Sequence, residues 1–251
     1  LLLILVYLFL AVARNEINPA DKILPLPGAM VDAMRALVFE RDPLSGRYLF
    51  WADTLASLQR LASGVLISAS IGLVVGIATG SLPLFRAGIS PLVTGMSLVP
   101  PLAILPILFI IFGLGELAKV MLIIIGITPF LIRDLQQRAE EIPTEQIIKM
   151  QTLGANTWQI ITRLVLPQIM PRLLSSVRLS LGSAWLFLIA AEAIAATEGL
   201  GYRIFLVRRY LSMDVIFPYV AWITFLAASA DFAIDRLRRR LFPWSELEGG
   251  R

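Results

Sequence analysis

A carboxylate inside an apolar segment is the side chain of this sequence best suited to chemistry within a membrane. Glu192 lies in an apolar run over residues 169–196. A charged group in hydrocarbon is costly, and such residues usually face a water-filled cavity or pair with a partner. Two roles are open for Glu192. It can line a path or hold a gate, or it can lie near the outer end of the segment and bond to loop backbone such as the turn at 199–201.

Other charged and polar residues extend this set. Arg178 lies in the same run, about four helical turns from Glu192, which is too far for direct pairing. A pathway lined by Arg178 would favour an anion, whereas one lined by Glu192 would favour a cation or a zwitterion. Asp231 and Asp235 lie one turn apart beside several arginines, and we expect ion pairs there rather than a proton relay. The candidates for a translocation pathway are Thr94, Ser97, Pro101, Arg178, Ser183 and Glu192.

Several functions are excluded by residues that the sequence lacks. It contains no histidine and no cysteine, which removes the commonest general base and the softest metal ligands. It also lacks the G-x-x-x-x-G-K-[ST] loop that holds nucleotide phosphates. We therefore expect no catalytic residue, no metal site and no cofactor bound by this chain, and a membrane enzyme is the least favoured function.

The composition is that of a membrane protein. Hydrophobic residues make up 57% of the 251 residues, against roughly 45–50% in soluble domains. We predict an all-α polytopic membrane protein with about six transmembrane helices in a single domain over residues 1–251. The predicted spans are residues 1–12, 62–80, 91–112, 117–132, 169–196 and 215–232. Because the chain begins at Leu1 rather than Met, we expect further residues to precede it.

Two spans carry local features. Glycines recur every four residues from Gly72 to Gly80, which lets another helix approach closely; packing within one subunit is favoured over a dimer contact. Prolines from Pro100 to Pro106 interrupt the span at 91–112. Prolines free backbone carbonyls that need a partner or a water-lined cavity. The broken span is therefore a candidate wall of a pathway, or a kink satisfied by its neighbours.

Basic residues set the expected orientation. Arg236 and residues 238–240 follow the last span, and such clusters favour the cytoplasmic side. Counting back through the predicted spans places both termini and the segment 133–167 in the cytoplasm. Arg203, Arg208 and Arg209 then fall outside, against the rule. That is tolerable if their segment folds onto the protein or faces an acidic partner.

The segment 144–167, TEQIIKMQTLGANTWQIITRLVLP, lies between two apolar runs and still has the pattern of folded structure. Residues 144–153 can form a short helix. Gly154 follows where a left-handed C-terminal cap is wanted, because glycine adopts positive φ without a Cβ clash.

A second short helix is expected next. Asn156 or Thr157 can cap it, with Gln159 near the capping-box position. Pro167 is expected to end it. A helix–glycine–helix element between two membrane runs predicts a surface that docks on something outside the membrane.

This segment resembles the cytoplasmic coupling loop of ABC-importer permeases, which reads E-A-A, three residues, G, nine residues, I-x-L-P. Gly154, Leu166 and Pro167 match, Leu164 replaces the isoleucine, and residues 148–150 read Ile-Lys-Met in place of E-A-A. Further stretches are similar to permeases of the nitrate, sulfonate and taurine type. These stretches are Pro100-Pro101 through Leu105-Pro106, Phe112-Gly113, Lys119, and Glu192 followed by Gly199-Leu200-Gly201-Tyr202.

The resemblance implies a type I ABC-importer permease fold and import of a small polar solute such as nitrate, a sulfonate, taurine or bicarbonate. The implied partners are separate ATPase subunits that hold ATP and Mg, a second copy of the permease in a homodimer, an extracytoplasmic solute-binding protein and membrane lipid, with no nucleic acid. The implied location is the bacterial inner membrane. The residues implied to contact the ATPase are Gln151, Thr152, Leu153, Gly154, Ala155, Asn156, Thr157 and Trp158.

An ion-coupled secondary transporter that uses Glu192 is the alternative. Such a protein would want ionisable residues in several spans and repeated halves. In this sequence only Glu192 is clearly intramembrane, and no convincing repeat is present. Stimulation of a separate ATPase would distinguish the two functions.

Overall fold

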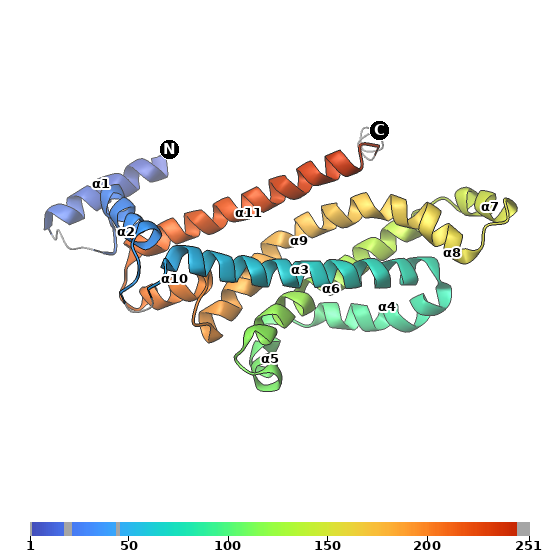
Figure 1. The fold of residues 1–251 in the computed structure, drawn as a ribbon, viewed down its shortest axis with the longest axis horizontal. Coiled ribbons are helices and arrows are strands. Elements are labelled where there is room, and N and C mark those ends of the chain that lie inside the picture. Colours follow the sequence, from blue (N-terminus) through green and yellow to red (C-terminus); the bar gives the residue numbers. More distant parts are fainter. Residues whose placement is uncertain (1, 18–21, 44–45, 245–251) are drawn as a thin grey trace. The chain divides into compact units, whose positions relative to one another are not determined.

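A computed structural model describes residues 2–17, 22–43 and 46–244, and within these residues the chain is helical with no strand, as the sequence predicts. Leu1, part of the first predicted span, lies outside the described residues. In chain order the helices are α1 Leu2–Ile17, α2 Pro27–Phe39, α3 Leu49–Ser81, α4 Pro83–Leu98, η1 Pro101–Ile104, α5 Leu105–Phe112, α6 Glu116–Glu140, α7 Thr144–Thr152, α8 Thr157–Ile160, η2 Ile161–Val165, α9 Leu166–Ala195, α10 Leu200–Arg208 and α11 Met213–Leu241 (Figure 1).

Long apolar helices dominate the described part of the chain. Within it, three stretches are long and apolar enough to cross a membrane: Leu49–Ser81, Thr157–Ala195 and Met213–Leu241. Pro83–Leu98 and Pro101–Phe112 meet the same criterion together and are bent by 84° at the break between them. The positions of the six predicted spans stay a prediction.

The chain divides into two compact units, which are described separately. Unit 1 comprises Leu1–Arg60 and Leu188–Leu226, and unit 2 comprises Leu61–Phe187 and Ala227–Arg251. The assignment of the whole chain to a single membrane domain stays a prediction.

In unit 2, the glycines of α3 form a row of contacts with α6. A Cβ added at Gly72 would lie 2.8 Å from Leu131 Cβ, and one added at Gly76 would lie 2.8 Å from Leu135 Cβ. The next glycine of the row, Gly80, meets Ala139 in the same way. The partner residues on α6 therefore repeat at the same four-residue interval. The glycine spacing serves helix packing within one subunit, which is the option that the sequence favoured.

The proline-rich stretch breaks the chain between α4 and η1, as the sequence predicts. Pro100 precedes the short 3-10 helix that Pro101 begins, and the two flanking helices are bent by 84°. Pro106 does not break α5, because it lies in the first turn, where the missing N–H needs no helical partner.

Unit 1 gathers the beginning of the chain around the start of α11. Tyr7 Oη donates a hydrogen bond to the Pro25 carbonyl at 2.7 Å. Met213 is the first residue of α11, and its amide donates to the Lys22 carbonyl at 3.0 Å. Aromatic rings join the start of α3 to α11, since Phe50 lies 5.7 Å from Tyr219 between ring centroids.

Candidate functional site

The segment 144–167 ends its first helix in a Schellman motif. Gly154 has a φ of 81°, in the left-handed region that glycine alone adopts at little cost. Its amide donates to the Gln151 carbonyl at 2.9 Å, and the Ala155 amide donates to the Met150 carbonyl at 3.0 Å. These two bonds satisfy carbonyls that the helix end leaves unpaired. The predicted glycine cap is therefore present.

The second helix begins with the predicted capping box. The Gln159 amide donates to Asn156 Oδ1 at 2.9 Å, and the Asn156 amide donates to Gln159 Oε1 at 2.9 Å. Of the two caps that the sequence left open, the structure selects Asn156, while Thr157 is the first residue of α8. Such a reciprocal pair fixes the start of a helix without tertiary contacts.

The end of this second helix differs from the prediction. Pro167 does not terminate it, since α8 continues through the π-helical turn η2 into α9. A π turn widens the helix locally and shifts its hydrogen bonds by one residue, so the proline, which has no N–H to donate, is accommodated at the start of α9. The predicted loop 133–167 is accordingly mostly helical, because α6 also extends to Glu140.

Three large apolar side chains of this segment are exposed. Leu153 is 75% exposed, Trp158 is 71% exposed and Ile148 is 52% exposed. All three lie close to Gly154 in the sequence. The predicted ATPase contacts thus form one short element: Gln151 and Thr152 end α7, Leu153–Ala155 form the turn, and Asn156–Trp158 begin α8.

Three of the predicted pathway residues line one hollow of about 810 Å³ in unit 2. Thr94 and Ser97 of α4 lie on its wall together with Pro101 at the break. The opposite wall is one face of α6, which contributes Arg133 and Gln137. The sequence did not single out this face of α6, although polar residues recur along it at helical spacing.

The other pathway candidates lie elsewhere. Arg178 pairs with Asp231 Oδ1 at 2.8 Å and with Asp235, so the aspartates are ion-paired as the sequence predicts. Ser183 is exposed on α9 and does not line the hollow. Glu192 belongs to unit 1.

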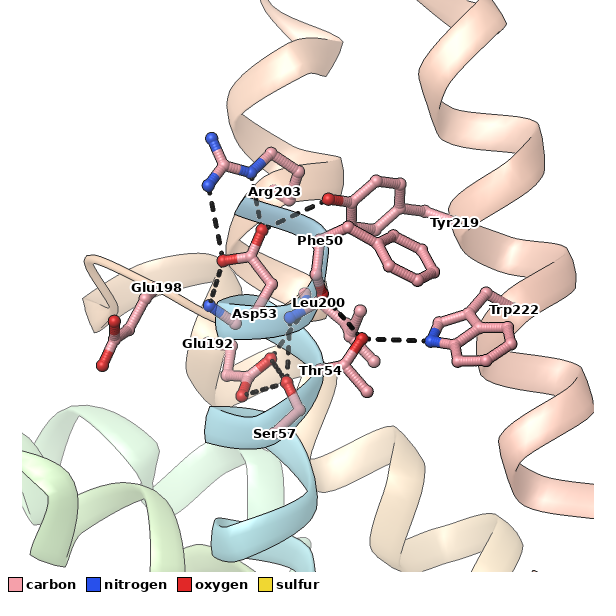
Figure 2. Close-up of polar contacts among 12 residues, drawn as sticks. Phe50, Asp53, Thr54, Ser57, Glu192, Glu198, Leu200, Arg203, Tyr219 and Trp222 are labelled. Carbon is pink, nitrogen blue, oxygen red and sulfur yellow. Dashed lines mark hydrogen bonds and ion pairs between the residues drawn. The ribbon is translucent and has the colours of Figure 1, made fainter. Parts of the chain in front are cut away.

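Glu192 is fully buried in a polar network with α3 (Figure 2). Ser57 Oγ donates to Glu192 Oε1 at 2.7 Å, and Arg60 Nη1 donates to the same oxygen at 2.7 Å. The Gly201 amide donates to Glu192 Oε2 at 2.9 Å. This is the hydrogen-bonded arrangement with the 199–201 turn, one of the two roles open from the sequence.

Asp53, one of the residues that sequence reasoning missed, extends the same network toward α10. Its carboxylate accepts a bond from the Gly199 amide at 2.9 Å and from Arg203 Nε at 2.7 Å (Figure 2). Burial lowers the pKa of Arg203 while the bond to Asp53 raises it, and the net shift is upward. The segment around Arg203 therefore folds onto the protein, one of the two explanations offered for basic residues on the outer side.

Gly199 and Gly201 are required by close packing against Glu192. Gly199 has a φ of 132°, and a Cβ there would lie 2.6 Å from the Glu192 carboxyl. A Cβ at Gly201 would lie 2.7 Å from the Ile189 carbonyl oxygen. The G-L-G sequence thus lets the backbone reach a buried carboxylate. Because that carboxylate is fully engaged, the geometry does not favour an ion-coupled transporter based on Glu192.

Long apolar helices, a polar hollow and a capped element with exposed apolar side chains are features of a membrane permease. The family described as "Binding-protein-dependent transport system inner membrane component" matches residues 70–245. The chain belongs to this family, and it is therefore the membrane permease of an ABC import system.

Individual relatives agree with this assignment. The chain is 34% identical over 194 residues to the taurine transport system permease protein TauC of Escherichia coli, covering 77% of this chain and 70% of TauC. It is 28% identical to the putative aliphatic sulfonates transport permease protein SsuC of Bacillus subtilis, covering 88% of this chain and 78% of SsuC.

A solved structure supports the fold. A chain from inward-facing conformations of the MetNI methionine ABC transporter superposes with a TM-score of 0.67 at 23% identity, covering 77% of this chain and 96% of that one.

Proposed function

We propose that this permease carries a small anionic or zwitterionic solute, of the sulfonate, taurine, nitrate or bicarbonate type, into the cell, while a separate subunit hydrolyses ATP. The names of the relatives, which include taurine and aliphatic sulfonate permeases, support this substrate class. The chain itself contributes no catalytic group and holds no cofactor, and ATP with its Mg is bound by the partner.

The element 144–167 docks on that ATPase subunit. The observation that carries this proposal is the exposure of Leu153 and Trp158 on a segment whose backbone is fixed by its own caps. Exposed apolar side chains grouped on a defined surface are typical of protein contacts. A rigid element can transmit the motion of a partner, because its caps resist local unfolding.

The complete transporter contains two copies of this permease and an outer solute-binding protein. The family description, which is of binding-protein-dependent transport, supports the solute-binding protein. Both termini lie in the cytoplasm, because the basic residues of 236–240 lie at the C-terminal end of α11 and favour that side.

A co-purification experiment tests the docking proposal. The tagged permease is expressed with its ATPase, extracted in mild detergent, and the bound ATPase is quantified for Gly154→Asp. We expect at least a tenfold loss of bound ATPase, because a carboxylate would enter an apolar contact. Gly154→Asn is the matched control, since asparagine is close to aspartate in size, adopts positive φ more readily than most other non-glycine residues and adds no charge.

The outcomes separate two causes. Loss of ATPase from Gly154→Asp alone supports docking through this surface. Equal retention of ATPase by wild type, Gly154→Asp and Gly154→Asn would show that the ATPase binds elsewhere. A permease that purifies alone and transports solute on an ion gradient would contradict the proposed energy source.

A further inference from the structure

Two opposite faces of α6 have different surroundings. One face packs on α3 through Leu131 and Leu135, which meet its glycines. The other face, with Phe130, Arg133 and Gln137, lines the hollow opposite α4. Figure 1 shows α4 and α6 side by side, and both helices belong to unit 2. Hydroxyl groups of α4 and amide and charged groups of α6 therefore line the same hollow, among apolar side chains.

Both carboxylates of the hollow are neutralised by arginines from other helices. Asp134 accepts a bond from Arg172 Nε at 2.9 Å and a further bond from Ser176. Glu140 pairs with Arg86 Nε at 3.1 Å. These two acids therefore add little net charge to the space between α4 and α6.

Arg133 is the cation that remains. Its side chain is exposed to the hollow, and its one partner in the described part of the chain is Ser97 Oγ, 3.2 Å from Nη1. A guanidinium carries five N–H donors, so most of its donors point to no acceptor among the described residues. Ser97 in turn donates to the Thr94 carbonyl at 2.7 Å, which holds its hydroxyl oxygen toward Arg133.

We propose that Arg133, supported by Ser97, contacts the anionic group of the solute in the hollow and selects for anions during transport. This inference rests on the proposed function. A guanidinium recognises sulfonate, carboxylate or bicarbonate oxygens through paired N–H donors. It also gives the charge preference a definite source, because Arg178 and Glu192 are both occupied by partners within the protein.

Transport in proteoliposomes tests the role of Arg133. The whole transporter, with its ATPase and solute-binding protein, is reconstituted, and ATP-dependent uptake of labelled taurine, methanesulfonate, nitrate and bicarbonate is measured. For the transported anion, we expect Arg133→Gln to lower the maximal uptake rate by about tenfold or more, since hydrogen bonds to charged groups are among the stronger ones. Arg133→Lys keeps the charge and should recover part of the rate.

Two controls distinguish transport from assembly. Arg209→Gln removes an exposed arginine of unit 1 and should leave uptake unchanged. ATP hydrolysis stimulated by the loaded binding protein is measured for each variant. We expect Arg133→Gln to hydrolyse ATP within about twofold of wild type, because its defect lies in passing the solute and not in docking.

The results that would overturn the inference differ from those that overturn the proposed function. If Arg133→Gln takes up an anion at the same rate as the wild type, the role of Arg133 is refuted, whereas the proposed function is not. Loss of the dimer or of the ATPase from Arg133→Gln would assign Arg133 to an assembly contact instead. Wild-type uptake restricted to a cation, such as guanidinium, would refute both proposals.

Discussion

Removing Arg60 should destabilise unit 1 more than removing any surface charge. The Arg60 side chain is 4% exposed, and its Nη1 lies 2.7 Å from Glu192 Oε1. The same nitrogen donates to the Glu198 carbonyl at 2.8 Å. Arg60→Met keeps much of the side-chain volume but leaves the Glu192 carboxylate buried with Ser57 and the Gly201 amide alone. Breaking a buried ion pair from one side costs about 3–5 kcal/mol.

The expected fall in melting temperature follows from this free energy. At about 2–4 °C per kcal/mol for a chain of this size, Arg60→Met should melt roughly 6–20 °C below wild type. The double variant Arg60→Met/Glu192→Leu removes both charges and should be more stable than Arg60→Met. Tryptophan fluorescence during heating in detergent includes a signal from this unit, because Trp222 donates to Thr54 Oγ1 at 3.1 Å.

A surface ion pair in the same unit provides the control. Arg47 lies 3.7 Å from the Glu198 carboxylate, and its side chain is 71% exposed. Arg47→Met should cost less than about 1 kcal/mol. Equal melting temperatures for Arg60→Met and Arg47→Met would refute the argument. So would a double variant whose loss equals the sum of the losses of Arg60→Met and Glu192→Leu, since independent residues show no coupling energy.

Two further predictions concern unit 2. Gly80→Ala should lose about 1–3 kcal/mol of stability in the same melting assay, because its Cβ would lie 2.9 Å from the Gln136 carbonyl oxygen. Gly88→Ala should lose none, because nothing lies within 4 Å of its added Cβ. Equal losses of stability in the two variants would contradict packing as the cause. Asn156→Ala should lose about 1 kcal/mol of capping energy, so the Gln159 amide should exchange hydrogen roughly fivefold faster; an unchanged rate would show that tertiary contacts, not the cap, hold α8.

Local patterns predicted much of the coupling segment. Gly154 and the Asn156 capping box are encoded within a few residues, so sequence spacing suffices to place them. The same holds for the glycines of α3, whose interval matches the helical repeat. Pro167 was misjudged because the π turn before it has no comparable sequence signature.

Long-range partners explain what the sequence did not show. Glu192 was recognised as intramembrane, but its partner Arg60 lies 132 positions away, and nothing in local spacing joins them. Asp53 was overlooked because it lies outside the predicted spans, and its partner Arg203 lies 150 positions away. Likewise, Arg133 gains its significance only once Arg172 and Arg86 are seen to neutralise the neighbouring acids.

The row of glycines on α3 has a mechanical consequence. Each glycine of this row on α3 leaves a gap that one side chain of α6 fills, as Leu135 does at Gly76. These contacts repeat every four residues, or about 6 Å along a helix. A displacement of α6 along α3 by one or two ångströms would move these side chains out of the gaps and against the backbone of α3. The two helices therefore move together as a rigid pair. The conformational change of a transport cycle must then occur at other positions, such as the proline break before η1.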